Sequence, residues 1–158
     1  MDQTLKQDYT RRIAMANRSE IINIVFELAN VYMTDAQNAI ESSDDTKAWE
    51  ECNRAKECIH HLIKSLDYQY ELAQPLLQIY QFASKEITSS AVNHNVEGIQ
   101  HAKKLMTTLA GAFYEASKQD TSEPVMSHTQ TVYAGLTYGK NQLNESLTDE
   151  GSLRGLWV

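Results

Sequence analysis

Cysteine is scarce in this chain, and its placement excludes two kinds of site. Cys52 and Cys58 are the only cysteines among 158 residues. Because they stand six residues apart, their side chains on one helix would point about 120° away from each other. That separation excludes a disulfide or a shared metal ion between them. We therefore expect two reduced thiols and no metal or other cofactor.

Basic residues and long apolar runs are also in short supply. The chain has 14 Lys and Arg against 21 Asp and Glu, so its formal net charge is −7. Nucleic acids and anionic membranes favour clustered Lys and Arg, so we expect neither as the main partner. No apolar run reaches the roughly 20 residues that cross a membrane, and the first 16 residues do not resemble a targeting signal. We expect a cytoplasmic protein whose partner is a protein.

Helix-breaking residues are few, which favours an all-α fold. Pro75 and Pro124 are the only prolines, and most glycines lie past residue 110. Asn17 is a good N-cap, and Glu20 completes a capping box for a helix that should run to about Ser42. We expect Asn95 to cap the last of three further helices. Their apolar stripes are Ala48, Cys52, Ala55, Ile59, Leu62 and Leu66; Ala73, Leu76, Tyr80, Ala83, Ile87 and Ala91; and Ile99, Ala102, Met106, Leu109, Phe113 and Ala116.

Four long helices with short joints predict an antiparallel four-helix bundle. We expect the bundle to span residues 17–117, after a capping segment at residues 1–16 that forms a short helix and presents Tyr9 and Ile13. A polar, glycine-containing and irregular tail should occupy residues 118–158. Within it, the stretch "HTQTVYAGLTYG" alternates weakly and is compatible with an extended segment on the bundle.

The stretch "IINIVFELANVYM", residues 21–33, is more apolar than one bundle interface requires. Its apolar side chains sweep roughly 220° of the helix, about twice the width of one core-facing stripe. The surplus must be covered either by Tyr9 and Ile13 or by another chain. Phe26 lies at the edge of the apolar arc, so we expect it to line a groove more than the innermost core, which Val25 should mark.

Catalytic and metal-binding patterns are nearly absent from the sequence. The single Glu-x-x-His pair, Glu57 and His60, points about 180° away from the helix stripe, so a metal site is not expected there. No nucleophile elbow or phosphate-binding glycine loop is found, so we expect no enzyme. His61 with Lys64 resembles the site of a histidine phosphotransfer domain, although Ser65 stands where such domains usually have glycine. This signalling bundle is the alternative hypothesis.

Several stretches resemble the flagellar secretion chaperones of the FliS family. "ANRSEIINIVFELA" is similar to the family's opening motif, and "ELAQPLLQIYQF" resembles the start of a later helix. "SLDYQYELA" and "AVNHNVEGIQ" fit the two later joints, so the likeness covers roughly Tyr9 to Ala116. Arg18 replaces a usual proline, Leu28 replaces a usual glycine, Pro75 is inserted, and the long tail is outside the common pattern.

The resemblance implies a cytoplasmic chaperone that binds the helical C-terminal segment of flagellin. Such a chaperone blocks premature polymerisation and assists delivery to the flagellar export apparatus. In the family a short N-terminal helix covers the binding surface and gives way to flagellin, which would be the role of Tyr9 and Ile13 here. The partner-binding residues that we expect are Tyr9, Ile13, Ile22, Phe26, Met33, Leu72, Ile79 and Phe82.

Overall fold

The computed structural model describes residues 3–128, and these residues form helices and connections with no strand. The predicted all-α fold class is therefore confirmed. The elements are α1 (Gln3–Met15), α2 (Arg18–Glu41), α3 (Asp45–Lys64), α4 (Ala73–Asn93), α5 (Glu97–Ser117) and the short 3₁₀-helix η1 (Val125–His128). Most of the predicted tail, including nearly all of "HTQTVYAGLTYG", lies outside the described residues.

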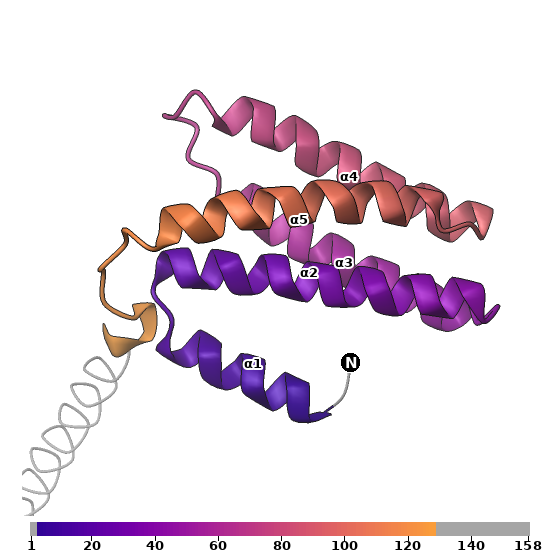
Figure 1. The fold of residues 1–158 in the computed structure, drawn as a ribbon, viewed down its shortest axis with the longest axis horizontal. Coiled ribbons are helices and arrows are strands. Elements are labelled where there is room, and N and C mark those ends of the chain that lie inside the picture. The colour runs from indigo at the N-terminus through magenta and orange to yellow at the C-terminus, as the bar shows by residue number, and fades with distance from the viewer. Residues whose placement is uncertain (1–2, 129–158) are drawn as a thin grey trace, which may run out of the picture.

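Helices α2 to α5 form an antiparallel bundle in which each helix packs against two neighbours (Figure 1). Helix α2 packs against α3 and α5, and α4 packs against the same two helices. Helix α1 lies outside this bundle, along the free side of α2 and antiparallel to it (Figure 1). Helix α2 is consequently the one helix with packed neighbours on three sides.

Local hydrogen bonds determine where α2 and α3 begin. The backbone N–H of Glu20 donates to Asn17 Oδ1 at 2.9 Å, and the backbone N–H of Asn17 donates to Glu20 Oε2 at 2.8 Å. This reciprocal arrangement confirms the predicted capping box. Asp44 caps α3 in a similar way, accepting a hydrogen bond from the backbone N–H of Lys47.

The start of α5 differs from the prediction, since Asn95 is not its cap. Helix α4 ends at His94, whose φ of 49° places it in the left-handed region, and Val96 occupies the N-cap position of α5 without a side-chain bond. The buried hydroxyl of Ser90, on α4, accepts the hydrogen bond from the backbone N–H of Ile99 at 2.9 Å. One of the unpaired N–H groups of α5 is therefore satisfied by the neighbouring helix rather than by its own cap.

The core of the bundle is one cluster with residues from all four bundle helices. Every residue of the three stripes predicted for α3, α4 and α5 is buried or half-buried except Ala116. Cys52 and Cys58 are buried free thiols, and burial raises the pKa of each to about 11. Both thiols are consequently protonated and unreactive at neutral pH.

Gly98 permits the close approach of α5 to α4. A Cβ atom at this position would collide with the carbonyl oxygen of Glu86 and would lie 2.7 Å from Ser90 Oγ. The carbonyl belongs to the rigid backbone of α4, so it cannot move away cheaply. Gly111, in the same helix, has nothing within 4 Å of the equivalent Cβ position.

We predict that Gly98→Ala and Gly111→Ala change stability in opposite directions. Gly98→Ala should lower the free energy of unfolding by about 2 kcal/mol, because α5 must shift away from α4. Gly111→Ala should raise it by roughly 0.5–1 kcal/mol, because alanine is the better helix former in open space. Urea denaturation followed by circular dichroism measures both. Equal effects of the two substitutions would contradict the close approach.

Candidate partner-binding surfaces

The wide apolar arc of α2 divides into two faces with different neighbours. One face, formed by Phe26, Ala29, Met33 and Ala36, is buried in the bundle core. The second face, formed by Ile21, Ile24 and Leu28, packs against Tyr9, Ile13 and Ala16 from α1 and the hinge that follows it. The predicted surplus is therefore covered within the chain by Tyr9 and Ile13.

The prediction that Phe26 lines a groove while Val25 marks the innermost core is wrong in the described structure. Phe26 is 0% exposed, and its ring centroid lies 6.3 Å from that of Tyr80 and 5.2 Å from that of Phe113. Val25 is only half-buried and lines a surface cavity. Met33, also predicted as a binding residue, is 0% exposed in the same core cluster.

The physical reason for this error is that the polar stripe of α2, formed by Asn23, Glu27 and Asn30, faces neighbouring helices. Asn23 Nδ2 donates to Ser117 Oγ of α5 at 2.7 Å, and Thr107 Oγ1 donates to Asn30 Oδ1 at 3.4 Å. Glu27 accepts hydrogen bonds from α1. The edge of the apolar arc, where Phe26 lies, is therefore inside the bundle.

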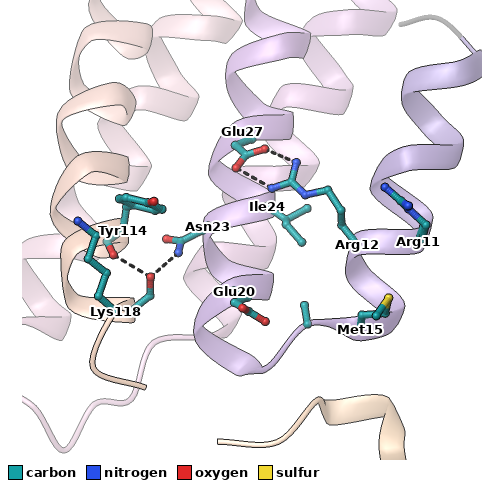
Figure 2. Close-up of a pocket in the computed structure, with 11 residues that line it drawn as sticks. Arg11, Arg12, Met15, Glu20, Asn23, Ile24, Glu27, Tyr114 and Lys118 are labelled. Carbon is teal, nitrogen blue, oxygen red and sulfur yellow. Dashed lines mark hydrogen bonds and ion pairs between the residues drawn. The ribbon is translucent and has the colours of Figure 1, made fainter. Parts of the chain in front are cut away.

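Helix α1 is held on α2 by a small apolar contact and by one ion pair, Arg12 with Glu27, which Figure 2 shows. Tyr9 is its single buried residue. Arg12 Nη1 and Nη2 donate to the two carboxylate oxygens of Glu27 at 2.7 and 2.9 Å, and the Arg12 guanidinium lies 5.3 Å from the centre of the Tyr9 ring. Burial raises the pKa of the Tyr9 hydroxyl, and the Glu27 carboxylate raises it further.

A cavity of ≈ 610 Å³ lies between α1, α2 and the C-terminal end of α5 (Figure 2). Its lining includes Arg12, Glu20, Asn23, Glu27, Tyr114 and Lys118. Its ionic groups are already paired, since Arg12 binds Glu27 and Lys118 binds Glu115 at 2.8 Å. Its lining therefore combines paired charged groups with the apolar side chains of Met15, Ala16 and Ile24.

An apolar groove of ≈ 450 Å³ lies between α4 and α5. Ile79 and Phe82 from α4 face Leu105 and Leu109 from α5 across it, and Phe82 is 47% exposed. His101, Lys104 and Thr108 complete the lining. An exposed aromatic ring between aliphatic walls is the usual anchor point for an amphipathic helix.

A second apolar region lies at the end of the bundle where α3 joins α4. Ile22 and Leu72 line a cavity of ≈ 190 Å³ there, together with Tyr70, Leu76 and Phe113. An adjoining cavity of ≈ 420 Å³ is lined by Ile21, Ile22, Val25, His61, Ser65 and Val125. Ile22 belongs to both, so these two cavities form one continuous end surface.

The structure thus distributes the eight predicted binding residues over four places. Tyr9 and Ile13 lie in α1, Ile22 and Leu72 at the end surface, Ile79 and Phe82 in the α4–α5 groove, and Phe26 and Met33 in the core. Sequence reasoning missed Leu105 and Leu109 as groove residues. Leu109 belongs to the stripe predicted for the core. Leu105 is the residue before Met106 of that stripe, so its position could have indicated a wider apolar face.

Residues 3–128 offer little for the alternative hypothesis. His61 is exposed in the last turn of α3, where it lines the end surface beside Ser65. Within these residues no three His, Cys, Asp or Glu side chains are grouped so as to hold a metal ion.

None of the described helices has the length and apolar character needed to cross a bilayer.

Comparison with known proteins identifies one family. The family model described as "Flagellar protein FliS" matches residues 1–120, which is well over half of the chain. The match includes all five α-helices and confirms the resemblance seen from Tyr9 to Ala116. A comparison with curated proteins finds no match.

We predict that Phe26 matters far more than Val25 for the stability of the bundle. Phe26→Ala should lower the free energy of unfolding by about 3–5 kcal/mol, because it leaves a cavity between Tyr80 and Phe113. Val25→Ala should cost about 1 kcal/mol, since this side chain is half-buried. Urea titration of both variants measures the difference. A larger loss for Val25→Ala would show that the packing of α2 is different from that described.

Proposed function

The chain belongs to the FliS family of flagellar proteins, and from this premise we propose that it binds the C-terminal helical segment of flagellin. The family is one of export chaperones and not of enzymes. We further propose that binding prevents premature polymerisation of flagellin in the cytoplasm and assists its delivery to the flagellar export apparatus. The observation that carries the proposal is the open apolar groove between α4 and α5 in a chain of this family.

The α4–α5 groove has the chemistry that an amphipathic partner helix requires. Ile79, Phe82, Leu105 and Leu109 offer apolar contact, while Lys104 and Thr108 give its border polar character. A helix that is unstable alone gains its ordering energy by burying its apolar face in such a groove. The groove therefore supports capture of a segment that would otherwise remain exposed.

The face of α2 under α1 is the second candidate surface, and its present cover is weakly held. Side chains of Arg12 and Glu27 remain 39% and 44% exposed, and ion pairs at such exposure are worth roughly 0–1 kcal/mol. Tyr9 is the only buried residue of α1. A partner segment with a larger apolar face would displace α1 at modest cost and cover Ile21, Ile24 and Leu28 in its place.

We predict that Phe82→Glu weakens flagellin binding at least tenfold and leaves the fold intact. Phe82 is the exposed aromatic of the groove, and a carboxylate there would be buried without a partner on binding. Val92→Glu is the matched control, because Val92 is also an exposed apolar residue of α4 but lines none of the grooves described above. Titration with a flagellin C-terminal peptide measures the affinity. Equal binding by both variants would mean that flagellin does not use this groove.

We also predict that removal of residues 1–15 strengthens or accelerates flagellin binding. A self-covering helix lowers apparent affinity by the fraction of time for which it occupies the surface. The milder Arg12→Gln should act in the same direction, because it removes the ion pair with Glu27. Arg11→Gln is its control, since Arg11 is exposed and pairs with Asp8 inside α1. Weaker binding after the deletion would instead indicate that Tyr9 and Ile13 contact flagellin directly.

A further inference from the structure

The segment that follows α5 returns to the hinge between α1 and α2. This hinge consists of Ala16 and Asn17, both of which are buried. The backbone N–H of Val125 donates to the carbonyl oxygen of Ala16 at 3.1 Å. The side-chain amide of Asn17 donates to the carbonyl oxygens of Asp120 and Ser122, each at 3.4 Å. The hinge is therefore bonded to residues more than 100 positions later in the chain.

The Asp120 side chain links the same segment to the first turn of α2. Its Oδ2 accepts a hydrogen bond from the hydroxyl of Ser19, in the first turn of α2, and its Oδ1 accepts one from the backbone N–H of Ser122 at 3.0 Å. The bond from Ser19, followed by that from Ser122, lowers the pKa of Asp120 to about 2. Asp120 is consequently ionised at neutral pH, and both bonds are charge-assisted.

These contacts restrain the motion that would uncover α2. If α1 swings away, the backbone dihedrals of Ala16 and Asn17 must change, because these are the only two residues between the helices. Ala16 is hydrogen-bonded to Val125, and Asn17 is hydrogen-bonded to Asp120 and Ser122. The bond between Ser19 and Asp120 attaches the segment after α5 to the first turn of α2. The 3₁₀-helix η1 also packs against α1 (Figure 1).

We propose that residues 118–125 form a clasp that holds α1 closed over α2 and sets how readily this helix opens. The clasp is an autoinhibitory element distinct from the Arg12–Glu27 pair, because it acts on the hinge and not on the contact face of α1. Its consequence for flagellin binding rests on the proposed function, but the restraint on α1 is a property of the free chain and is measured without a partner.

Hydrogen–deuterium exchange of the full-length free protein tests the clasp. Asp120→Ala removes the bonds from Ser19 and from the Ser122 N–H, and amides of α1 should then exchange at least about threefold faster, while amides of α3 remain unchanged. Glu123→Ala is the matched control, because Glu123 is an exposed carboxylate of the same segment for which the described structure shows no hydrogen bond or ion pair. Unchanged exchange in α1 after Asp120→Ala, or an equal effect of Glu123→Ala, would overturn the proposal.

A second variant tests the backbone contact independently of the carboxylate. Val125→Pro removes the N–H that donates to Ala16, and it should also accelerate exchange in α1. Ser19→Ala combined with Asp120→Ala should accelerate exchange no more than Asp120→Ala alone, because both remove the same bond. Additive effects of Ser19→Ala and Asp120→Ala would show that the two residues act separately and would contradict the clasp.

Flagellin titration of the same variants separates this proposal from the proposed function. Faster exchange in α1 together with faster peptide association supports both. Faster exchange with unchanged peptide binding supports the clasp and shows that flagellin does not use the face under α1. Slower or unchanged exchange overturns the clasp whatever the peptide does.

Discussion

Coverage of α2 is the constraint on which the rest of this structure depends. This helix carries apolar side chains over roughly 220° of its circumference, and a helix in a four-helix bundle has too few neighbours to bury them all. The bundle covers Phe26, Ala29, Met33 and Ala36, and α1 covers Ile21, Ile24 and Leu28. Without α1 the chain would expose a contiguous apolar patch, which favours association with another chain.

The two covers of α2 differ in strength because they differ in the area and chemistry of contact. On the face of α2 toward the bundle, Phe26 packs against the rings of Tyr80 and Phe113, and the three residues come from different helices. On the face toward α1, the contact consists mainly of the buried Tyr9 and the half-exposed ion pair of Arg12 with Glu27. The contact with α1 is therefore the weaker of the two covers of α2. Under the proposed function, this difference would let the chain keep its fold while a client segment takes the place of α1.

Contacts between distant parts of the chain correct several local expectations. Ser90 of α4 satisfies a backbone N–H of α5, so α5 begins without a capping side chain of its own. Glycine is required at position 98 because a side chain there would collide with a backbone carbonyl of α4, and not because the chain turns. Asn17 serves twice, as the N-cap of α2 and as a donor to the segment after α5. The hinge of α1 is thus part of both a local and a long-range hydrogen-bond arrangement.

The sequence by itself determined the elements, because capping boxes and helical periodicity are local: Asn17 and Glu20 predicted the start of α2, and the stripes through Ile59, Ile87 and Met106 predicted the core. It also showed that α2 has a surplus apolar face and left open whether Tyr9 and Ile13 or another chain covers it; the structure places Tyr9 and Ile13 there. The resemblance to the FliS family was likewise evident from the sequence. It placed Phe26 wrongly and omitted Leu105, because a helical wheel shows which side chains share a face but not which neighbours stand over that face. Only the tertiary structure decided that Ser117 and Thr107 of α5 bind Asn23 and Asn30 of α2, and that Phe26 consequently lies in the bundle core. It likewise brought Asp120 to Ser19, since a contact across 101 residues leaves no periodic trace in the chain.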